Sequence, residues 1–144
     1  MKNHLVRVYP SKEHLNREDQ LAWKLASVAS DTAPNDLQAT DMVINRIIDN
    51  ASVALAAANR EPPTAARAQA LAHPREKGAR LLGCNKNISV DAEWAAWANG
   101  TAVRELDYHD TFLAADYAHP GDNIPPILAV AQQVGCNGED LLRG

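Results

Sequence analysis

The stretch that decides the fold is NDLQATDMVINRIIDNASVALAAA, residues 35–58. Its apolar residues recur at the i, i+3, i+4 and i+7 spacing of an amphipathic helix; they are Ile44, Ile47, Ile48, Ala51, Leu55 and Ala58. Asn35 can cap this helix at its start, and Gln38 follows three residues later, as in a capping box. We therefore predict a helix over 36–58 whose Ile-rich face points into the core.

The sequence on both sides of this helix is also helical in character. Upstream, a helical pattern begins near Glu18 and ends at the Pro34 break. The segment 73–89 is rich in Gly, Asn and Lys and is predicted to be a loop with at most one short strand. Further helices are predicted from Pro62 or Pro63 through Leu71, from Ser89 or Asp91 onward, from Asn123 to Gly135, and from Asn137. The fold class is therefore all-α, a helical bundle with at most one or two short strands.

The chain has the composition of a folded domain. Its 144 residues are 46% hydrophobic, 22% charged and 5% aromatic, values typical of a soluble globular protein. Alanine dominates the apolar fraction, and alanine favours helices. We expect residues 1–16 to form a loosely held arm and residues 17–144 to form a helical domain.

The charge of the sequence argues against nucleic acid as a partner, and its hydropathy argues against a membrane. The formal net charge is −4 and the isoelectric point is near 5.7. There is no Lys/Arg cluster that could follow a phosphate backbone, so nucleic acid is not expected as a partner. No run approaches the roughly 18 apolar residues of a membrane span, and the first residues lack the apolar core of a signal peptide. We expect no membrane partner and a cytoplasmic location.

The cysteines and tryptophans are predicted to be structural. Cys84 and Cys136 lie far apart and in no CxxC motif, so we expect reduced thiols. Two cysteines are also too few to hold an iron–sulfur cluster unaided, since such clusters take about four Cys ligands. Trp94 and Trp97 lie on one predicted helix and are expected to pack in the core.

One segment, LDYHDTFLAADYAHPGDNIPP (residues 106–126), gathers titratable and hydroxyl groups among apolar residues. If the preceding helix continues to Thr111, then Asp107, Asp110 and Thr111 share one helical face. A carboxylate facing apolar neighbours holds its proton more tightly than one in water. Asp107 is therefore a candidate proton-transfer group, with the Thr111 hydroxyl one turn away.

The second half of this segment adds an imidazole and a helix start. His119 follows the apolar FLAADYA segment and can be folded back to face Thr111. HPGDN then leads into a helix capped by Asn123, and free N–H groups at a helix start favour carboxylate or phosphate ligands. An acid/base pair beside a carboxylate-binding position suits dehydration or decarboxylation of a carboxylate-bearing substrate.

Other interpretations of these residues remain open. Asp122 and Asn123 are also ordinary turn and capping residues, and Asp110 could hydrogen-bond a helix end. His109, Asp110, Asp116 and His119 could supply nitrogen and oxygen ligands to a metal. Metal-dependent phosphohydrolases need further His and Asp ligands on other helices, and none stands out here. We therefore expect no metal.

The segment AEWAAWANGTAVRELDYHDTFLAADYAHPGDNIPPILAVAQ, residues 92–132, closely resembles the MmgE/PrpD family, in the branch that dehydrates 2-methylcitrate. A weaker likeness includes DMVINRIIDNASVALAA (41–57) and AQALAHP (68–74), so it covers most of the chain from Glu18 onward. The LDYHDTFLAADYAHPGDN block is long and unusual in composition, which makes the resemblance specific.

The resemblance implies a large all-helical domain with a smaller α+β lid domain, and catalysis without an iron–sulfur cluster or other cofactor. The implied reaction converts 2-methylcitrate to 2-methyl-cis-aconitate in the methylcitrate cycle of propionate catabolism. It also places Asp107, Thr111 and His119 in the active site. We add Asp110 and Asn123 as candidate substrate-binding residues.

The resemblance also carries expectations about what lies outside the chain. Family enzymes are several times longer, and a lysine and further histidines of their site lie in later sequence. We expect an N-terminal portion that lacks the lid and has little or no activity alone. The partners expected are a tricarboxylate substrate and, for the full-length enzyme, a second subunit in a homodimer. Decarboxylation of cis-aconitate and a non-catalytic helical module for dimerisation remain alternatives.

Overall fold

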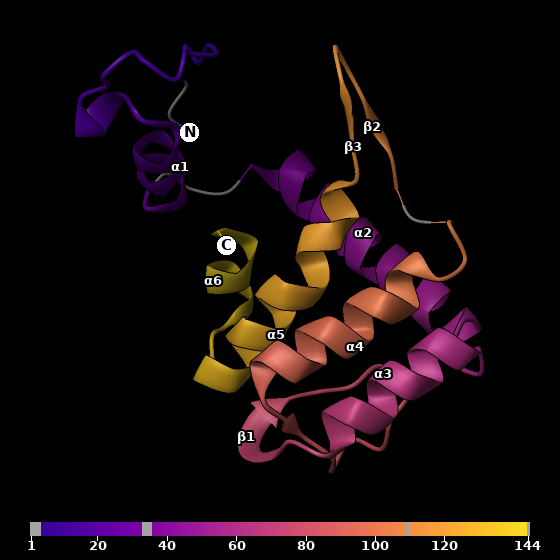
Figure 1. Cartoon of the computed structure of the whole chain (residues 1–144). Coiled ribbons are helices and arrows are strands. Elements are labelled where there is room, and N and C mark those ends of the chain that lie inside the picture. Colours follow the sequence, from indigo (N-terminus) through magenta and orange to yellow (C-terminus); the bar gives the residue numbers. More distant parts are fainter. Residues whose placement is uncertain (1–3, 33–35, 109, 144) are drawn as a thin grey trace.

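A computed structural model describes residues 4–32, 36–108 and 110–143, and the described part is mostly helical (Figure 1). Its elements in chain order are η1 (Arg17–Asp19), α1 (Leu21–Ala29), α2 (Leu37–Ala56), α3 (Glu61–Leu71), β1 (Pro74–Ala79), α4 (Ala92–Arg104), β2 (Phe112–Leu113), β3 (Tyr117–Ala118), η2 (Pro120–Asn123), α5 (Ile124–Val134) and α6 (Gly138–Arg143). The predicted all-α fold class is confirmed, with short strands as the minor part.

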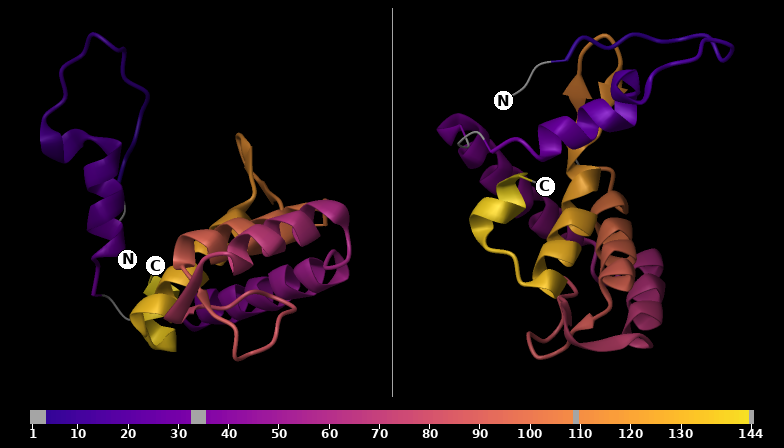
Figure 2. Two further views of the ribbon diagram at one scale, coloured as in Figure 1. Left: turned by 60° about the horizontal axis from the view of Figure 1, so that its bottom comes forward. Right: turned by 90° about the vertical axis from the view of Figure 1, so that its left-hand side faces the viewer.

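Helix α4 lies at the centre and packs against α2, α3 and α5 (Figures 1 and 2). β1 and the loop after it run below the ends of these helices, where Ala79 and Val90 form an isolated bridge. The main core cluster is built largely from alanine, and it consists of Ala66, Ala70, Ala79, Leu81, Val90, Ala92, Ala95, Ala98 and Ala129. Because alanine side chains are short, the helix axes can approach closely.

Helix α2 begins with a side-chain cap, as expected, but at a different residue. Asp36 Oδ1 accepts hydrogen bonds from the N–H groups of Gln38 at 2.7 Å and Ala39 at 3.2 Å. Two of the amides that a helix start leaves unpaired are thereby satisfied. Asn35, the predicted cap, lies outside the described residues.

The buried face of α2 is not the face that the Ile residues predicted. Asn50, Val53 and Ala54 are buried against α4 and η2, whereas Ile44 and Ile48 are 48% and 58% exposed. The two faces lie roughly two fifths of a turn apart. The prediction of an Ile-rich core face is wrong because α2 packs closely on α4, and small side chains allow that approach.

Helix α4 is shorter than predicted. It ends at Arg104 and does not continue to Thr111. Trp94, on its first turn, is half-buried and stacks on His73 with ring centroids 4.0 Å apart. Trp97 is 60% exposed, so the prediction that it packs in the core is wrong.

The remaining elements lie around this bundle. Gly135 ends α5 in the left-handed conformation with φ 76°, as its position in the sequence predicted. The N-terminal arm and α1 lie to one side of α3 and α4 (Figures 1 and 2).

Cys84 packs against the core, Cys136 is exposed, and both are free thiols. In the described part of the chain, no helix is both long and apolar enough to cross a membrane.

Candidate active site

The hairpin of β2 and β3 brings Thr111 and His119 together. Phe112 pairs with Ala118 in antiparallel register, so the next position outward places Thr111 opposite His119. Oγ1 of Thr111 lies 3.4 Å from Nδ1 of His119. The prediction that the FLAADYA segment folds back so that His119 faces Thr111 is confirmed.

Asp110 ties the two ends of the hairpin to each other. Its backbone carbonyl accepts a hydrogen bond from Nδ1 of His119 at 2.8 Å. Its carboxylate Oδ1 accepts from the N–H of Gly121 at 2.9 Å. Asp110 and His119 are half-buried and Thr111 is exposed. The imidazole ring is therefore held at Nδ1 by Asp110, while the side chain of Thr111 faces solvent.

The bond to the Asp110 carbonyl decides which ring nitrogen of His119 carries the proton. A carbonyl oxygen can only accept, so Nδ1 must donate. The lone pair of the neutral ring is then on Nε2. Nε2 is therefore the atom through which neutral His119 can take up a proton from a substrate.

Asp107 does not lie on a helix with Asp110 and Thr111. It follows the last turn of α4, where its N–H donates to the carbonyl of Arg104 at 3.4 Å. Its φ of 54° is left-handed, a conformation that Asp tolerates better than most residues. Because Asp107 is exposed, the burial on which its proposed acid/base character depended is absent.

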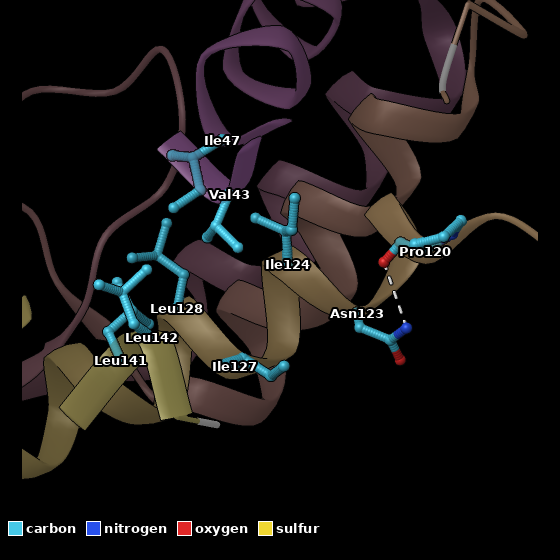
Figure 3. A pocket seen from close by; sticks show the side chains of 9 residues that line it. All are labelled: Val43, Ile47, Pro120, Asn123, Ile124, Ile127, Leu128, Leu141 and Leu142. Atoms are coloured by element: carbon cyan, nitrogen blue, oxygen red, sulfur yellow. Dashed lines mark hydrogen bonds between the residues drawn. The ribbon is translucent and has the colours of Figure 1, made fainter. Parts of the chain in front are cut away.

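Asn123 and Asp122 help to hold the turn between the hairpin and α5. Nδ2 of Asn123 donates to the carbonyl of Pro120 at 3.2 Å (Figure 3), and the Asn123 side chain makes no capping bond to α5. Asp122 pairs with the guanidinium of Arg104 at 3.3 Å. The ion pair joins the end of α4 to η2, so Asp122 is occupied by a structural contact.

The start of α5 offers fewer hydrogen-bond donors than a typical helix start. Pro125 and Pro126 occupy its first turn, and proline has no N–H. The proposed carboxylate-binding role of this helix start therefore depends on few backbone amides, and side chains must do most of the binding.

The four candidate metal ligands are only partly described. His109 lies outside the described residues. Within the described ranges no group of three or more His, Cys, Asp and Glu side chains is positioned to hold a metal ion. Asp110 and His119 use their polar groups on each other and on Gly121.

An apolar hollow of about 160 Å³ lies beside η2, between α2, α5 and α6 (Figure 3). Among the described residues, Asn123 is the one polar side chain in its lining, and the other walls are formed by Val43, Ile47, Pro120, Ile124, Ile127, Leu128, Leu141 and Leu142. A cavity of this character cannot balance the charge of a tricarboxylate. The polar cluster at the base of the hairpin is therefore the better candidate site.

Sequence reasoning missed two residues that support this cluster. Gly121 is buried beside Asp110, and a Cβ atom at position 121 would overlap Oδ1 of Asp110. Nδ2 of Asn50, on α2, lies on the same side of Gly121, 2.7 Å from the position of that Cβ atom. The signal that could have revealed Asn50 is its position within the Val53–Ala54–Ala57 stripe, at helical spacing from small apolar residues.

Comparison with known proteins gives a consistent result. The family model for the MmgE/PrpD N-terminal domain matches residues 19–144. A Saccharomyces cerevisiae protein named probable 2-methylcitrate dehydratase is 40% identical over an alignment of 73 residues, and the match covers 45% of this chain and 14% of that protein. The 2-methylcitrate dehydratases of Cupriavidus necator and Salmonella typhimurium are each 42% identical over 60 residues, which is 42% of this chain and 12% of those proteins. The match therefore spans a small part of the length of these relatives.

Proposed function

Since the chain belongs to the MmgE/PrpD family and matches its N-terminal domain, we propose that it supplies part of the active site of a hydro-lyase that dehydrates 2-methylcitrate. This reaction breaks a C–H bond next to a carboxylate and the C–O bond of the hydroxyl, and it releases water and 2-methyl-cis-aconitate. The observation that carries the proposal is the contact of His119 with Thr111 and Asp110 at the base of the hairpin.

The proposed role of His119 is supported by its hydrogen bonds, and that of Asp107 by the resemblance to the family. His119, through Nε2, and Asp107 form the acid/base pair: one takes the carbon-bound proton and the other protonates the departing hydroxide. The exposed Thr111 hydroxyl orients the substrate. Asp110 contributes by holding His119. Asn123 is exposed at the neighbouring turn and is proposed to bind the substrate.

The cluster needs positive charge that these residues do not supply. Arg104, at the end of α4, is already paired with Asp122. A tricarboxylate and the charge that develops in the transition state require further donors and cations. We propose that these come from other segments or from a second subunit of a homodimeric enzyme. The 144 residues alone are then expected to show little or no turnover.

The proposed reaction also suggests a place in metabolism. It would serve the methylcitrate cycle of propionate catabolism, in the cytoplasm. The names of the relatives from Saccharomyces cerevisiae and Cupriavidus necator support 2-methylcitrate as the substrate. Citrate and cis-aconitate are the alternatives to include in any substrate panel.

A segment exchange tests whether these residues can perform the chemistry. Residues 19–144 would replace the matching segment of the Cupriavidus necator enzyme, and formation of the unsaturated product would be followed by absorbance. We expect the chimera to dehydrate 2-methylcitrate. Asp107→Asn and His119→Ala, introduced into the chimera, should each lower kcat by about 10²–10⁴-fold, as expected for a lost proton-transfer group.

The alternative is a non-catalytic helical module that uses the same fold for association. The observation that favours it is the exposure of several aliphatic side chains on α2 and α5, which include Ile44, Ile48, Val130 and Val134. A chimera that folds with native circular dichroism and native subunit assembly, but has no activity, would support this module and contradict the dehydratase proposal.

A further inference from the structure

The described residues include two buried asparagines, and these two differ completely in their hydrogen bonds. Asn99 is 6% exposed; its Oδ1 accepts from the N–H of Leu82 and its Nδ2 donates to the carbonyl of Arg80, both at 2.9 Å. Asn50 is 3% exposed, and neither polar atom of its side chain has a hydrogen-bond partner among the described residues. Burying an amide without partners costs stability, so Asn50 requires an explanation.

The surroundings of Asn50 point to the candidate active site. Asn50 lies on the face of α2 that packs against η2. A Cβ atom placed on Gly121 would lie 2.7 Å from Nδ2 of Asn50 and would overlap Oδ1 of Asp110. The amide nitrogen and the carboxylate oxygen therefore both lie where a side chain at position 121 would begin, and only glycine leaves that space to them.

The electrostatics of this arrangement are favourable. The N–H hydrogens of Nδ2 carry partial positive charge, and the Asp110 carboxylate is negative. The opposite orientation of the amide would bring its oxygen towards the carboxylate. Inside the protein such a dipole–charge interaction is stronger than it is in water.

We propose that Asn50 is a positioning residue for the His119–Thr111 pair and acts through Asp110. Its amide dipole keeps the Asp110 carboxylate seated against the N–H of Gly121, and its N–H groups are the alternative donors when that bond opens. The seated Asp110 in turn presents its carbonyl to Nδ1 of His119. The catalytic role of His119 rests on the proposed function, whereas the link from Asn50 to His119 does not.

The proposal predicts opposite effects for matched changes at the two buried asparagines. Asn50→Leu removes an unsatisfied amide and should leave the thermal midpoint unchanged or raise it, while it loosens Asp110. Asn99→Leu leaves the Leu82 N–H and the Arg80 carbonyl without their side-chain partner, so it should lower the midpoint. Asn99→Leu should leave Asp110 and His119 unaffected.

NMR spectroscopy on the 144-residue chain tests this directly, without substrate. In Asn50→Leu we expect the Gly121 amide to exchange with solvent about tenfold faster, as for the loss of roughly one hydrogen bond. We also expect the ¹⁵N shifts of the His119 ring to show a smaller fraction of the Nδ1–H form. Unchanged Gly121 exchange together with unchanged His119 shifts, in a folded variant, would overturn the proposal. If leucine does not fit, Asn50→Ala decides by the same two signals.

Activity gives a separate readout. In an active chimera, Asn50→Leu should lower kcat by up to about 10²-fold, because misplacement of a reacting group by about 1 Å can have that effect, while KM changes little. An inactive chimera would contradict the proposed function and leave the NMR result on Asn50 standing. An active chimera whose kcat is unchanged by Asn50→Leu would contradict the positioning role.

Discussion

Thr111 and His119 face each other at the base of the β2–β3 hairpin, one position beyond the Phe112–Ala118 pair. The hairpin register alone sets this contact, because a shift by one residue would turn one of the two side chains to the opposite face. The tip of the hairpin is exposed, so packing does little to fix the register. The hydrogen bonds of Asp110 to His119 and Gly121 fix the register at the base of the hairpin.

Thr111→Val tests the role of the hydroxyl. Valine keeps the branched shape and suits a strand, so the thermal midpoint should change little at this exposed position. In the chimera we expect kcat to fall by up to about 10²-fold through poorer substrate orientation. Thr111→Ser keeps the hydroxyl and should retain most of the activity. Equal kcat values for Val and Ser would show that the hydroxyl has no role.

Gly121→Ala tests the crowding between Asp110 and Asn50. The added methyl would overlap the Asp110 carboxylate and press on Nδ2 of Asn50, so we expect a loss of about 1–3 kcal/mol in unfolding free energy. Chemical denaturation measures this value. Gly100→Ala is the matched control, because nothing lies within 4 Å of its added Cβ in α4. It should stabilise the helix by about 0.5–1 kcal/mol.

Asp36→Ala tests the cap of α2. Two backbone N–H groups lose their acceptor, so the unfolding free energy should fall by about 1 kcal/mol. Asp41→Ala, an exposed position within the same helix, should change it by less than about 0.5 kcal/mol. Urea denaturation of both variants makes the comparison. An equal effect at the two positions would argue against a specific capping contribution.

Arg75→Gln tests a contact between Arg75 and Asp91 that makes stability depend on pH. The hydrogen bond from Arg75, at 2.8 Å, lowers the pKa of Asp91 from its ordinary value of 3.8. A lowered pKa in the folded state means that the contact stabilises the fold above pH 3.8 and that this contribution is lost as the pH falls through the lowered pKa. In Arg75→Gln, NMR titration should show the pKa of Asp91 rising towards 3.8.

The control for this titration is Arg143→Gln, which removes an exposed pair with Glu139 in α6 and should leave the titration of Asp91 unchanged. The pair of Arg75 and Asp91 is half-exposed, so its effect on acid unfolding should be small. A pKa of Asp91 that does not move in Arg75→Gln would show that the guanidinium is not the cause of the shift.

The positions of the helices could be predicted from the sequence. The hydrophobic period located α2 and α5, proline pairs marked the starts of α3 and α5, and Gly135 marked the end of α5. These signals act over a few residues, because a helix closes its hydrogen bonds four residues apart. The contact of Thr111 with His119 was predicted for a similar reason, since a single apolar segment joins them.

Only the tertiary structure decided which face of α2 is buried, where α4 ends, and that Asn50 lies beside Gly121 and Asp110. The Ile face has the stronger hydrophobic pattern, yet the small side chains of Val53 and Ala54 allow α2 to approach α4. Which face becomes buried depends on the fit between two surfaces that are distant in sequence. Burial of Asn50 is a consequence of that fit, because the stripe of small residues that includes Asn50 competes with the more hydrophobic Ile face of the same helix.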